Sequence, residues 1–195
     1  MTSGKTVLIL GAGIGGAVAA SRLRRLLPRC HRVVVVEQAS THIFGPSLPW
    51  LMVGERSGRQ ISRPMTALAR HGIELVQGTI EHIDPARKVI RVDGRELAGD
   101  YLVIALGADL APEAVPGLAQ AGHNFYTLPG AESLCDARPG MRKGRIAVLV
   151  SAVPFKCPGA PHEAAMLLEH DCRRRGVRDQ ITIDLYTAEP GPMPV

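Results

Sequence analysis

The sequence predicts an α/β fold that begins with a strand, a helix and a second strand. Residues 5–10 are a short apolar run that ends at a cluster of glycines, as expected of a strand buried on both faces. Residues 15–27 are rich in alanine, leucine and arginine and stop before Pro28, which is typical of a helix. Residues 33–37 contain four consecutive valines, and such β-branched residues favour a central strand. Together these segments predict one right-handed βαβ unit of the Rossmann-like type.

The composition indicates a globular chain and argues against two classes of function. With 195 residues and 46% hydrophobic content, the chain can bury a substantial core in one or two domains. Its first apolar stretch is interrupted by glycines and arginines, far short of the ~20 apolar residues of a membrane-spanning helix. We therefore expect no transmembrane segment and a cytoplasmic location, with a peripheral position on the inner face of a membrane left open. The densest basic runs lie at residues 22–29 and 173–178, the ends of two predicted helices, where cations complement the helix dipole, so no nucleic-acid surface is predicted.

The remainder of the first domain predicts further strands and a small antiparallel element. Residues 41–63 predict an ordered connection, because they hold the only tryptophan, Trp50, whereas a flexible linker is rich in Gly and Ser. The pattern then predicts a helix at residues 64–71 and a short parallel strand at 73–76. Two antiparallel strands are predicted at 79–83 and 88–92, and a second buried strand, ending on glycine, at 101–107. These elements complete a predicted domain over residues 1–110.

A second Rossmann-like unit is predicted to begin in the last third of the chain. Residues 111–143 contain four prolines and predict connecting loops. Residues 144–195 predict a partial second nucleotide-binding-like domain made of a strand, a helix and a strand, at residues 145–151, 160–175 and 180–186. Because a two-stranded sheet is marginal alone, we expect either that the polypeptide continues or that these strands complete the first domain.

A glycine-rich motif lies directly between the first strand and the first helix. Gly11, Gly13 and Gly16 satisfy the pattern G-x-G-x-x-G. In such a motif the first glycine permits a tight turn, the second lets the backbone approach a pyrophosphate, and the third allows close packing of helix on sheet. The amino end of the helix then faces the phosphate oxygens. The motif therefore predicts a phosphate-bearing ligand at this turn.

An acidic residue supports a dinucleotide at the same place. Glu37 lies 21 residues after Gly16, at the end of the second strand, where a carboxylate accepts hydrogen bonds from ribose hydroxyls. The same charge would repel a 2′-phosphate. The predicted contact residues are Gly11, Ala12, Gly13, Ile14, Gly15, Gly16, Glu37 and Gln38.

Two later segments resemble flavoproteins of the two-dinucleotide-domain class. Ala105, Leu106 and Gly107 look like the Ala-Thr-Gly motif of those enzymes, although leucine here lacks the threonine hydroxyl. The hairpin at Thr79 and Ile80 matches the segment whose backbone contacts the adenine in them. The resemblance implies FAD rather than NAD as the cofactor, with Ile80, Ala105, Leu106 and Gly107 as further contacts.

Cys157 is the candidate catalytic residue. It stands just before the predicted helix at 160–175 and beside Lys156, and both neighbours favour a reactive thiolate, whereas Glu163 in the first helical turn opposes it if close. The preceding stretch lacks the paired glycines of a second pyrophosphate site, which disfavours a conventional NAD(P)H site there. The cysteines and histidines show no ligand spacing, so no metal is predicted.

At this point the chain resembles sulfide:quinone oxidoreductases and the flavin subunit of flavocytochrome c sulfide dehydrogenases. The resemblance lies in residues 5–38, 44–46 and 105–107 and in the Cys-Pro-Gly-Ala-Pro element at 157–161, all in the same order. It implies that Cys157 is the first member of a redox-active cysteine pair, which oxidises sulfide and passes electrons through FAD to a quinone or another electron carrier. The second cysteine of that family, its glycine-aspartate motif and its membrane-anchoring helices belong to its carboxyl-terminal half, which has no counterpart here.

Three functions therefore remain open. The first is an FAD-dependent oxidoreductase of the sulfide:quinone oxidoreductase type, incomplete as an isolated chain, whose donor is sulfide or another small reductant. The second is an NAD(P)H-dependent flavin or quinone reductase of the same architecture. The third is a noncatalytic FAD-binding fragment that needs a second chain, or a second copy of itself, to complete its site.

Overall fold

The computed structural model describes residues 4–191, which form two compact units. The first unit contains residues 4–44 and 62–110, and the second contains residues 45–61 and 111–191. The sequence places residues 45–61 in the first domain and treats 111–143 as connecting loops, whereas both segments are part of the second unit. In the second unit a short helix at Leu48–Met52 packs on two longer helices, and this packing makes residues 45–61 part of the second unit.

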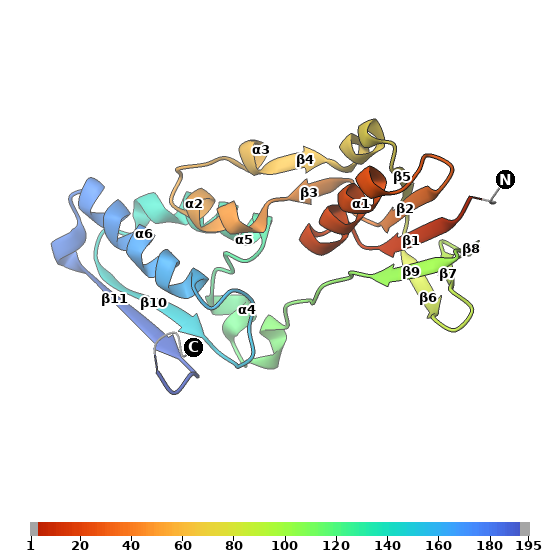
Figure 1. The fold of residues 1–195 in the computed structure, drawn as a ribbon. Helices are drawn as coiled ribbons and strands as arrows, with labels where there is room; N and C mark the ends of the chain where they lie inside the picture. Colours follow the sequence, from red (N-terminus) through yellow and green to blue (C-terminus); the bar gives the residue numbers. More distant parts are fainter. Residues whose placement is uncertain (1–3, 192–195) are drawn as a thin grey trace. The chain divides into compact units, whose positions relative to one another are not determined.

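A four-stranded parallel sheet forms the centre of the first unit (Figure 1). Its strand order is β5-β2-β1-β9, and each neighbouring pair is parallel. The helix α1 runs between β1 and β2 and completes the βαβ unit that the sequence predicts. The bounds are β1 Thr6–Leu10, α1 Ile14–Leu26, β2 Arg32–Glu37, β5 Glu74–Gln77 and β9 Tyr101–Ile104. The Rossmann-like fold is thus confirmed.

The alternation of side chains along β1 and β2 explains why these strands are apolar throughout. One set of side chains packs with α1, and the opposite set packs with a three-stranded antiparallel sheet of order β6-β7-β8. That small sheet, also predicted in part, consists of β6 Ile80–Asp84, β7 Val89–Val92 and β8 Arg95–Ala98. Each fully buried aliphatic side chain contributes roughly 1.5–3 kcal/mol, so burial on both faces is the main stabilisation of this unit.

The strand β9 differs from its prediction in length and in burial. It ends at Ile104 rather than at Gly107, and Tyr101 and Ile104 are 59% and 56% exposed. The reason is its place at the edge of the sheet, where β1 is its one partner among the strands of residues 4–191. Asp100 joins the starts of these two strands, because its carboxylate accepts hydrogen bonds from the Thr6 amide at 2.8 Å and from Lys5 Nζ at 2.9 Å. These two donors hold the pKa of Asp100 below its usual range.

Two more segments of the first unit differ from expectation. Residues predicted as a helix from position 64 form a 3₁₀ helix, η2 Met65–His71, which ends at Gly72 in the left-handed region. The segment around position 41 contributes a short antiparallel pair, β3 Thr41–Ile43 with β4 Ser62–Pro64. Neither strand is apparent from the sequence, because three-residue strands carry too little periodicity.

The second unit contains the second βαβ unit. Strands β10 Gly144–Val150 and β11 Ile181–Thr187 are parallel, and helix α6 Ala160–Arg174 connects them, as predicted. The other elements are η1 Gly45–Ser47, α2 Leu48–Met52, α3 Gly58–Ile61, η3 Pro112–Ala114, α4 Leu118–Ala121, α5 Leu128–Ala137, η4 Arg138–Gly140 and η5 Arg178–Gln180. None of the helices within residues 4–191 is long and apolar enough to cross a membrane.

The ten-residue helix α5 is absent from the sequence prediction, although its start has a recognisable signal. Thr127 caps it, with Oγ1 accepting a hydrogen bond from the Gly130 amide at 3.2 Å. Pro129 lies in the first turn, where a proline is tolerated because its missing N–H has no partner in the helix. The prolines of this region therefore mark the start of a helix as well as loops.

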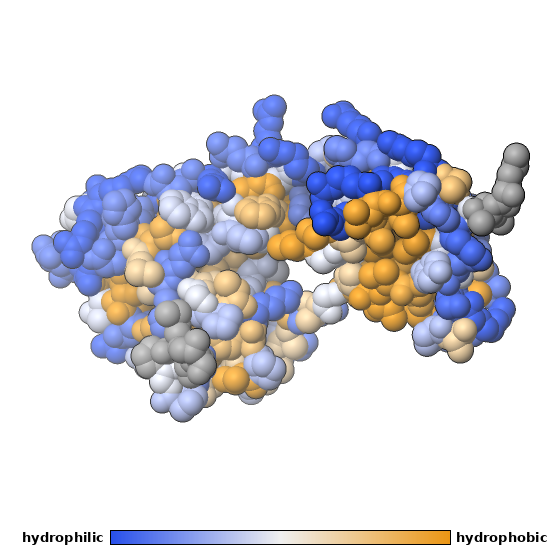
Figure 2. All heavy atoms as spheres, in the orientation of Figure 1, coloured by the Kyte–Doolittle hydropathy of each residue, from blue (hydrophilic) through white to orange (hydrophobic). Residues whose placement is uncertain are grey.

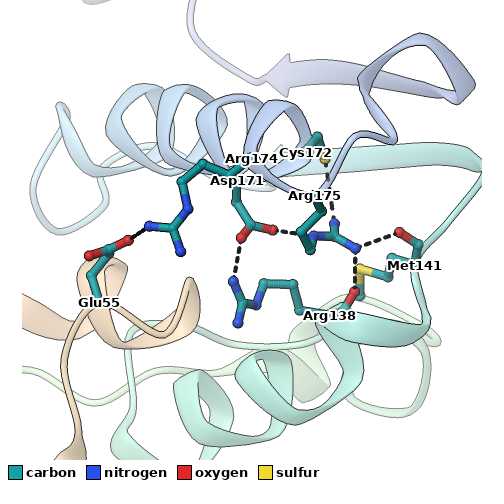
Figure 3. Close-up of polar contacts among 7 residues, drawn as sticks. All are labelled: Glu55, Arg138, Met141, Asp171, Cys172, Arg174 and Arg175. Atoms are coloured by element: carbon teal, nitrogen blue, oxygen red, sulfur yellow. Dashed lines mark hydrogen bonds and ion pairs between the residues drawn. The ribbon is translucent and has the colours of Figure 1, made fainter.

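A buried carboxylate joins α6 to the turn at η4 (Figure 3). Asp171 is 3% exposed and accepts hydrogen bonds from Arg138 and from Arg175 Nε, the latter at 2.7 Å. Arg175 also donates to the carbonyl oxygens of Arg138 and Met141, both at 3.0 Å. One carboxylate thus forms ion pairs with two guanidinium groups that are themselves largely buried.

We expect Asp171→Asn to lower the free energy of unfolding of the second unit by about 3 kcal/mol, because two largely buried arginine side chains lose their counter-charge. Asp179→Asn is the matched control, since Asp179 is exposed in the same unit and the change of charge is the same. Its effect should stay within about 0.5 kcal/mol. Urea denaturation measures both, and equal losses would contradict a structural role for the Asp171 cluster.

Candidate functional site

Packing requires two of the three motif glycines to lack a side chain. Gly11 has a φ of 90°, and a Cβ atom on it would lie 2.6 Å from the carbonyl oxygen of Ala105. A Cβ atom on Gly16 would lie 1.9 Å from the carbonyl oxygen of Gly11. No larger residue therefore fits at either position. Gly11 allows the tight turn after β1, and Gly16 allows the close contact between α1 and that turn.

Gly13 is different, because nothing in the fold excludes a side chain there. Apart from Gly13 itself and its chain neighbours, no heavy atom of residues 4–191 lies within 4 Å of a Cβ atom built on it. Its φ of −61° and ψ of −172° are open to any residue at the start of a helix. Glycine at this position leaves an open approach to the backbone in front of α1, which is the space that a pyrophosphate needs.

The Glu37 carboxylate connects the end of β2 to the glycine-rich turn. Its Oε2 accepts a hydrogen bond from the Ala12 amide at 2.7 Å, and its Oε1 accepts one from the Ala39 amide at 2.9 Å. His42 Nδ1 lies 3.0 Å from the Ala12 carbonyl oxygen. A carboxylate has about four acceptor positions, so Glu37 retains capacity for further donors such as ribose hydroxyls. The amide of Ala12, by contrast, is committed to Glu37.

A pocket of about 550 Å³ lies beside this turn in the first unit. It opens where the parallel strands end, which is the usual position of ligands in such sheets. Of the predicted contact residues, it is lined by Gly11, Glu37, Gln38, Ile80 and Leu106. The other predicted positions, Ala12, Gly13, Ile14, Gly15, Gly16, Ala105 and Gly107, are not among its lining residues.

Several lining residues escaped the sequence analysis. They come from the segment that follows β5 and from the chain beyond β9: Gly78, Glu81, His82, Ile83 and Asp109, together with Val36. Their positions follow from the topology, since β5 and β9 end at the same edge of the sheet as β1 and β2. No local motif marks them.

Cys157 lies in the second unit, in the nine-residue segment between β10 and α6. Its thiol is free and the residue is exposed. Its φ of 52° is left-handed, an uncommon conformation for a residue other than glycine, and its carbonyl oxygen accepts a hydrogen bond from the Ala160 amide at 3.0 Å. Glu163, which the sequence suggests could oppose a thiolate, accepts a hydrogen bond from Trp50 Nε1 at 3.0 Å.

The other cysteines are free thiols in different surroundings. Cys30 is exposed in the first unit, whereas Cys135 is half-buried and Cys172 is buried in the second. Over residues 4–191, no group of three or more His, Cys, Asp or Glu side chains is placed to hold a metal ion.

Comparison with known proteins shows one family along most of the chain. Residues 5–149 match the pyridine nucleotide-disulphide oxidoreductase family. The sulfide-quinone reductase of Aquifex aeolicus is 31% identical, over 95% of this chain and 44% of that protein. The mitochondrial sulfide:quinone oxidoreductase of Mus musculus is also 31% identical, over 93% of this chain and 42% of that protein. The solved structure of the Aquifex aeolicus enzyme superimposes with a TM-score of 0.87 at 27% identity, covering 95% of this chain and 44% of that one.

A second group of relatives differs in its electron donor. The alternative NAD(P)H-ubiquinone oxidoreductase C1 of Arabidopsis thaliana is 28% identical, over 94% of this chain and 40% of that protein. The chain spans less than half of the length of each of these relatives.

We expect Gly16→Ala to destabilise the first unit by about 2 kcal/mol or more, because its methyl group would overlap the Gly11 carbonyl oxygen. Gly13→Ala is the matched control from the same motif, and it should change the free energy of unfolding by no more than about 0.5 kcal/mol. Chemical denaturation of both variants checks the difference. If Gly13→Ala were as destabilising as Gly16→Ala, the open space in front of Gly13 would not exist.

Proposed function

The chain belongs to the pyridine nucleotide-disulphide oxidoreductase family, and on this premise we propose that it forms the amino-terminal part of an FAD-dependent oxidoreductase of the sulfide:quinone oxidoreductase type. The observation that carries the proposal is the open backbone at Gly13 beside a turn that Glu37 holds in place. Two glycines of the motif are needed by the fold, whereas the third is free to serve a ligand.

The family consists of FAD-binding flavoproteins, so FAD is the cofactor that both the sequence and the family indicate. The amide groups of the first turn of α1 have no partner within a helix and would donate to the pyrophosphate. Glu37 would accept hydrogen bonds from a ribose. The pocket beside the turn would receive the adjoining part of the cofactor, with Gln38, Ile80 and Leu106 on its wall. When bound, FAD supplies an acceptor for two electrons.

In the proposed reaction Cys157 carries sulfur. Its thiolate and the sulfur of the hydrogen sulfide anion would join in a persulfide; the two electrons released would pass to bound FAD, and the proton to FAD or to solvent. The exposed position of Cys157 admits a small reductant. A quinone is the proposed final acceptor, which the names of the relatives support, and a lipid-soluble acceptor implies a peripheral position on a membrane face.

Reduction by NAD(P)H is the second candidate, and the relatives of the NAD(P)H-ubiquinone type favour it. The segment between β10 and α6 weighs against it, because it contains a single glycine, Gly159, where a pyrophosphate site needs closely spaced glycines. We therefore rank sulfide above NAD(P)H as the donor.

A fragment that binds FAD without turnover is the third candidate. Apolar side chains gather over α1, β1 and β9 on the face seen in Figure 2, and the strand β9 leaves one edge of the sheet unpaired. Exposed apolar side chains of α1 and β9 include Val18 and Ile104, which are 62% and 56% exposed. An apolar surface of this kind supports a requirement for a second chain.

We expect Gly13→Ala to weaken FAD binding at least about tenfold, because its methyl group occupies the approach to the pyrophosphate. Gly140→Ala serves as the control, since Gly140 also has open space around it but lies in the second unit. Titration of flavin fluorescence measures both affinities. Equal FAD affinities for the two variants would show that the pyrophosphate does not lie against the glycine turn.

We further expect anaerobic sulfide to bleach the flavin bands of the FAD-bound protein, and Cys157→Ser to abolish this bleaching. Cys30→Ser is the matched control, because Cys30 is the other exposed cysteine and should be dispensable. Bleaching by NADH with no response to sulfide would favour the second candidate. A flavin that neither donor reduces would favour the third.

A further inference from the structure

The hydroxyl group of Tyr126 lies at the turn that contains Cys157. Tyr126 Oη donates a hydrogen bond to the Lys156 carbonyl oxygen at 2.8 Å and lies within 3.4 Å of the Cys157 carbonyl oxygen. Tyr126 and Cys157 belong to the same unit, although 31 residues separate them. No motif in the sequence connects these positions.

The two carbonyl groups belong to the peptide planes on either side of the Cys157 Cα atom. A single donor that engages both oxygens restrains both planes, and these planes set φ and ψ of Cys157. The restraint matters because Cys157 is left-handed, with φ of 52°, a region in which its Cβ is crowded. The Cys157 carbonyl oxygen also accepts the Ala160 amide, so the turn leads directly into α6.

Tyr126 is itself held in place by the start of α5. Its amide donates to Asn124 Oδ1 at 3.0 Å, and its ring packs against Phe125 with 5.0 Å between ring centroids. Thr127, the next residue, caps α5. Burial, with a smaller electrostatic contribution from the nearby Cys157, raises the pKa of Tyr126 to about 12. The hydroxyl therefore stays protonated, and remains a donor, at every pH at which the protein would work.

We propose that Tyr126 is a positioning residue for Cys157, and that its hydroxyl group fixes the left-handed turn that presents the thiol to a small sulfur reductant. The inference rests on the proposed role of Cys157 as the reactive thiol. It adds a residue that touches the backbone on both sides of the thiol and takes no part in bond formation.

Alkylation by iodoacetamide, followed for each cysteine by peptide mass spectrometry on the full chain, tests the proposal without FAD or sulfide. Tyr126→Phe retains the ring and should slow alkylation of Cys157 about fivefold, the effect of one lost hydrogen bond, while leaving Cys30 unchanged. The ratio of wild-type to variant rates should stay constant from about pH 7 to about pH 10, since the hydroxyl remains protonated throughout. Tyr186→Phe, which removes an exposed hydroxyl from β11 of the same unit, should change neither rate.

Equal Cys157 rates in the wild type and Tyr126→Phe would overturn the positioning role alone. A wild-type Cys157 that reacts no faster than Cys30 would instead overturn the reactive role of Cys157 and this inference with it.

A stability measurement keeps the proposal testable if Tyr126→Phe unfolds too readily for labelling. Glycine adopts the left-handed region without strain, so in a Cys157→Gly background the turn persists after the hydroxyl is lost. With cysteine present, the turn can leave the left-handed region once the hydroxyl is lost, and the strain that this relieves offsets part of the lost hydrogen bond. Tyr126→Phe should therefore shift the urea midpoint more in the glycine background than in the cysteine one. Equal shifts would show that the hydroxyl does not hold the turn.

Discussion

The hydrogen bond from the Ala12 amide to Glu37 is the contact on which the site in the first unit depends. It joins the end of β2 to the turn that follows β1, across 2.7 Å. Two further contacts support the same turn: the Gly11 amide donates to the Val36 carbonyl oxygen at 2.8 Å, and His42 Nδ1 lies 3.0 Å from the Ala12 carbonyl oxygen. Because the second carboxylate oxygen binds the Ala39 amide, the side chain is restrained at both oxygens. A residue that a dinucleotide site would use is therefore also a residue that shapes the site before any ligand arrives.

The first βαβ unit could be predicted from the sequence because its determinants are local. Helix α1 begins and ends within one residue of expectation, since a glycine turn precedes it and Pro28 follows shortly after it. The strand β9 could not be predicted to its end, because its apolar residues look like those of a central strand while the sheet places it at an edge. Whether a strand lies at the edge or in the centre depends on the other strands of the sheet, and a local sequence pattern holds no information about them.

The candidate sites likewise contain some residues that the sequence predicts and others that only the fold reveals. The glycines and Glu37 follow a spacing that a sequence reveals, whereas Asp109 and His82 reach the pocket only through the order of the strands. In the second unit, Cys157 stands out by its neighbours in sequence, but Tyr126 meets it from a different element. The buried cluster around Asp171 is similar, since Arg138 lies 33 residues away. Such pairs depend on tertiary packing, so no local sequence pattern identifies their members.

Hydrogen exchange of the backbone amides with and without FAD tests the central claim most directly. If the cofactor lies against the glycine turn, FAD should slow exchange at the first turn of α1, in the peptide that contains residues 13–17, and along the pocket wall at residues 78–83. The amide of Ala12 should exchange slowly in both states, because it already donates to Glu37. Unchanged exchange at the first turn of α1 under saturating FAD would contradict the account.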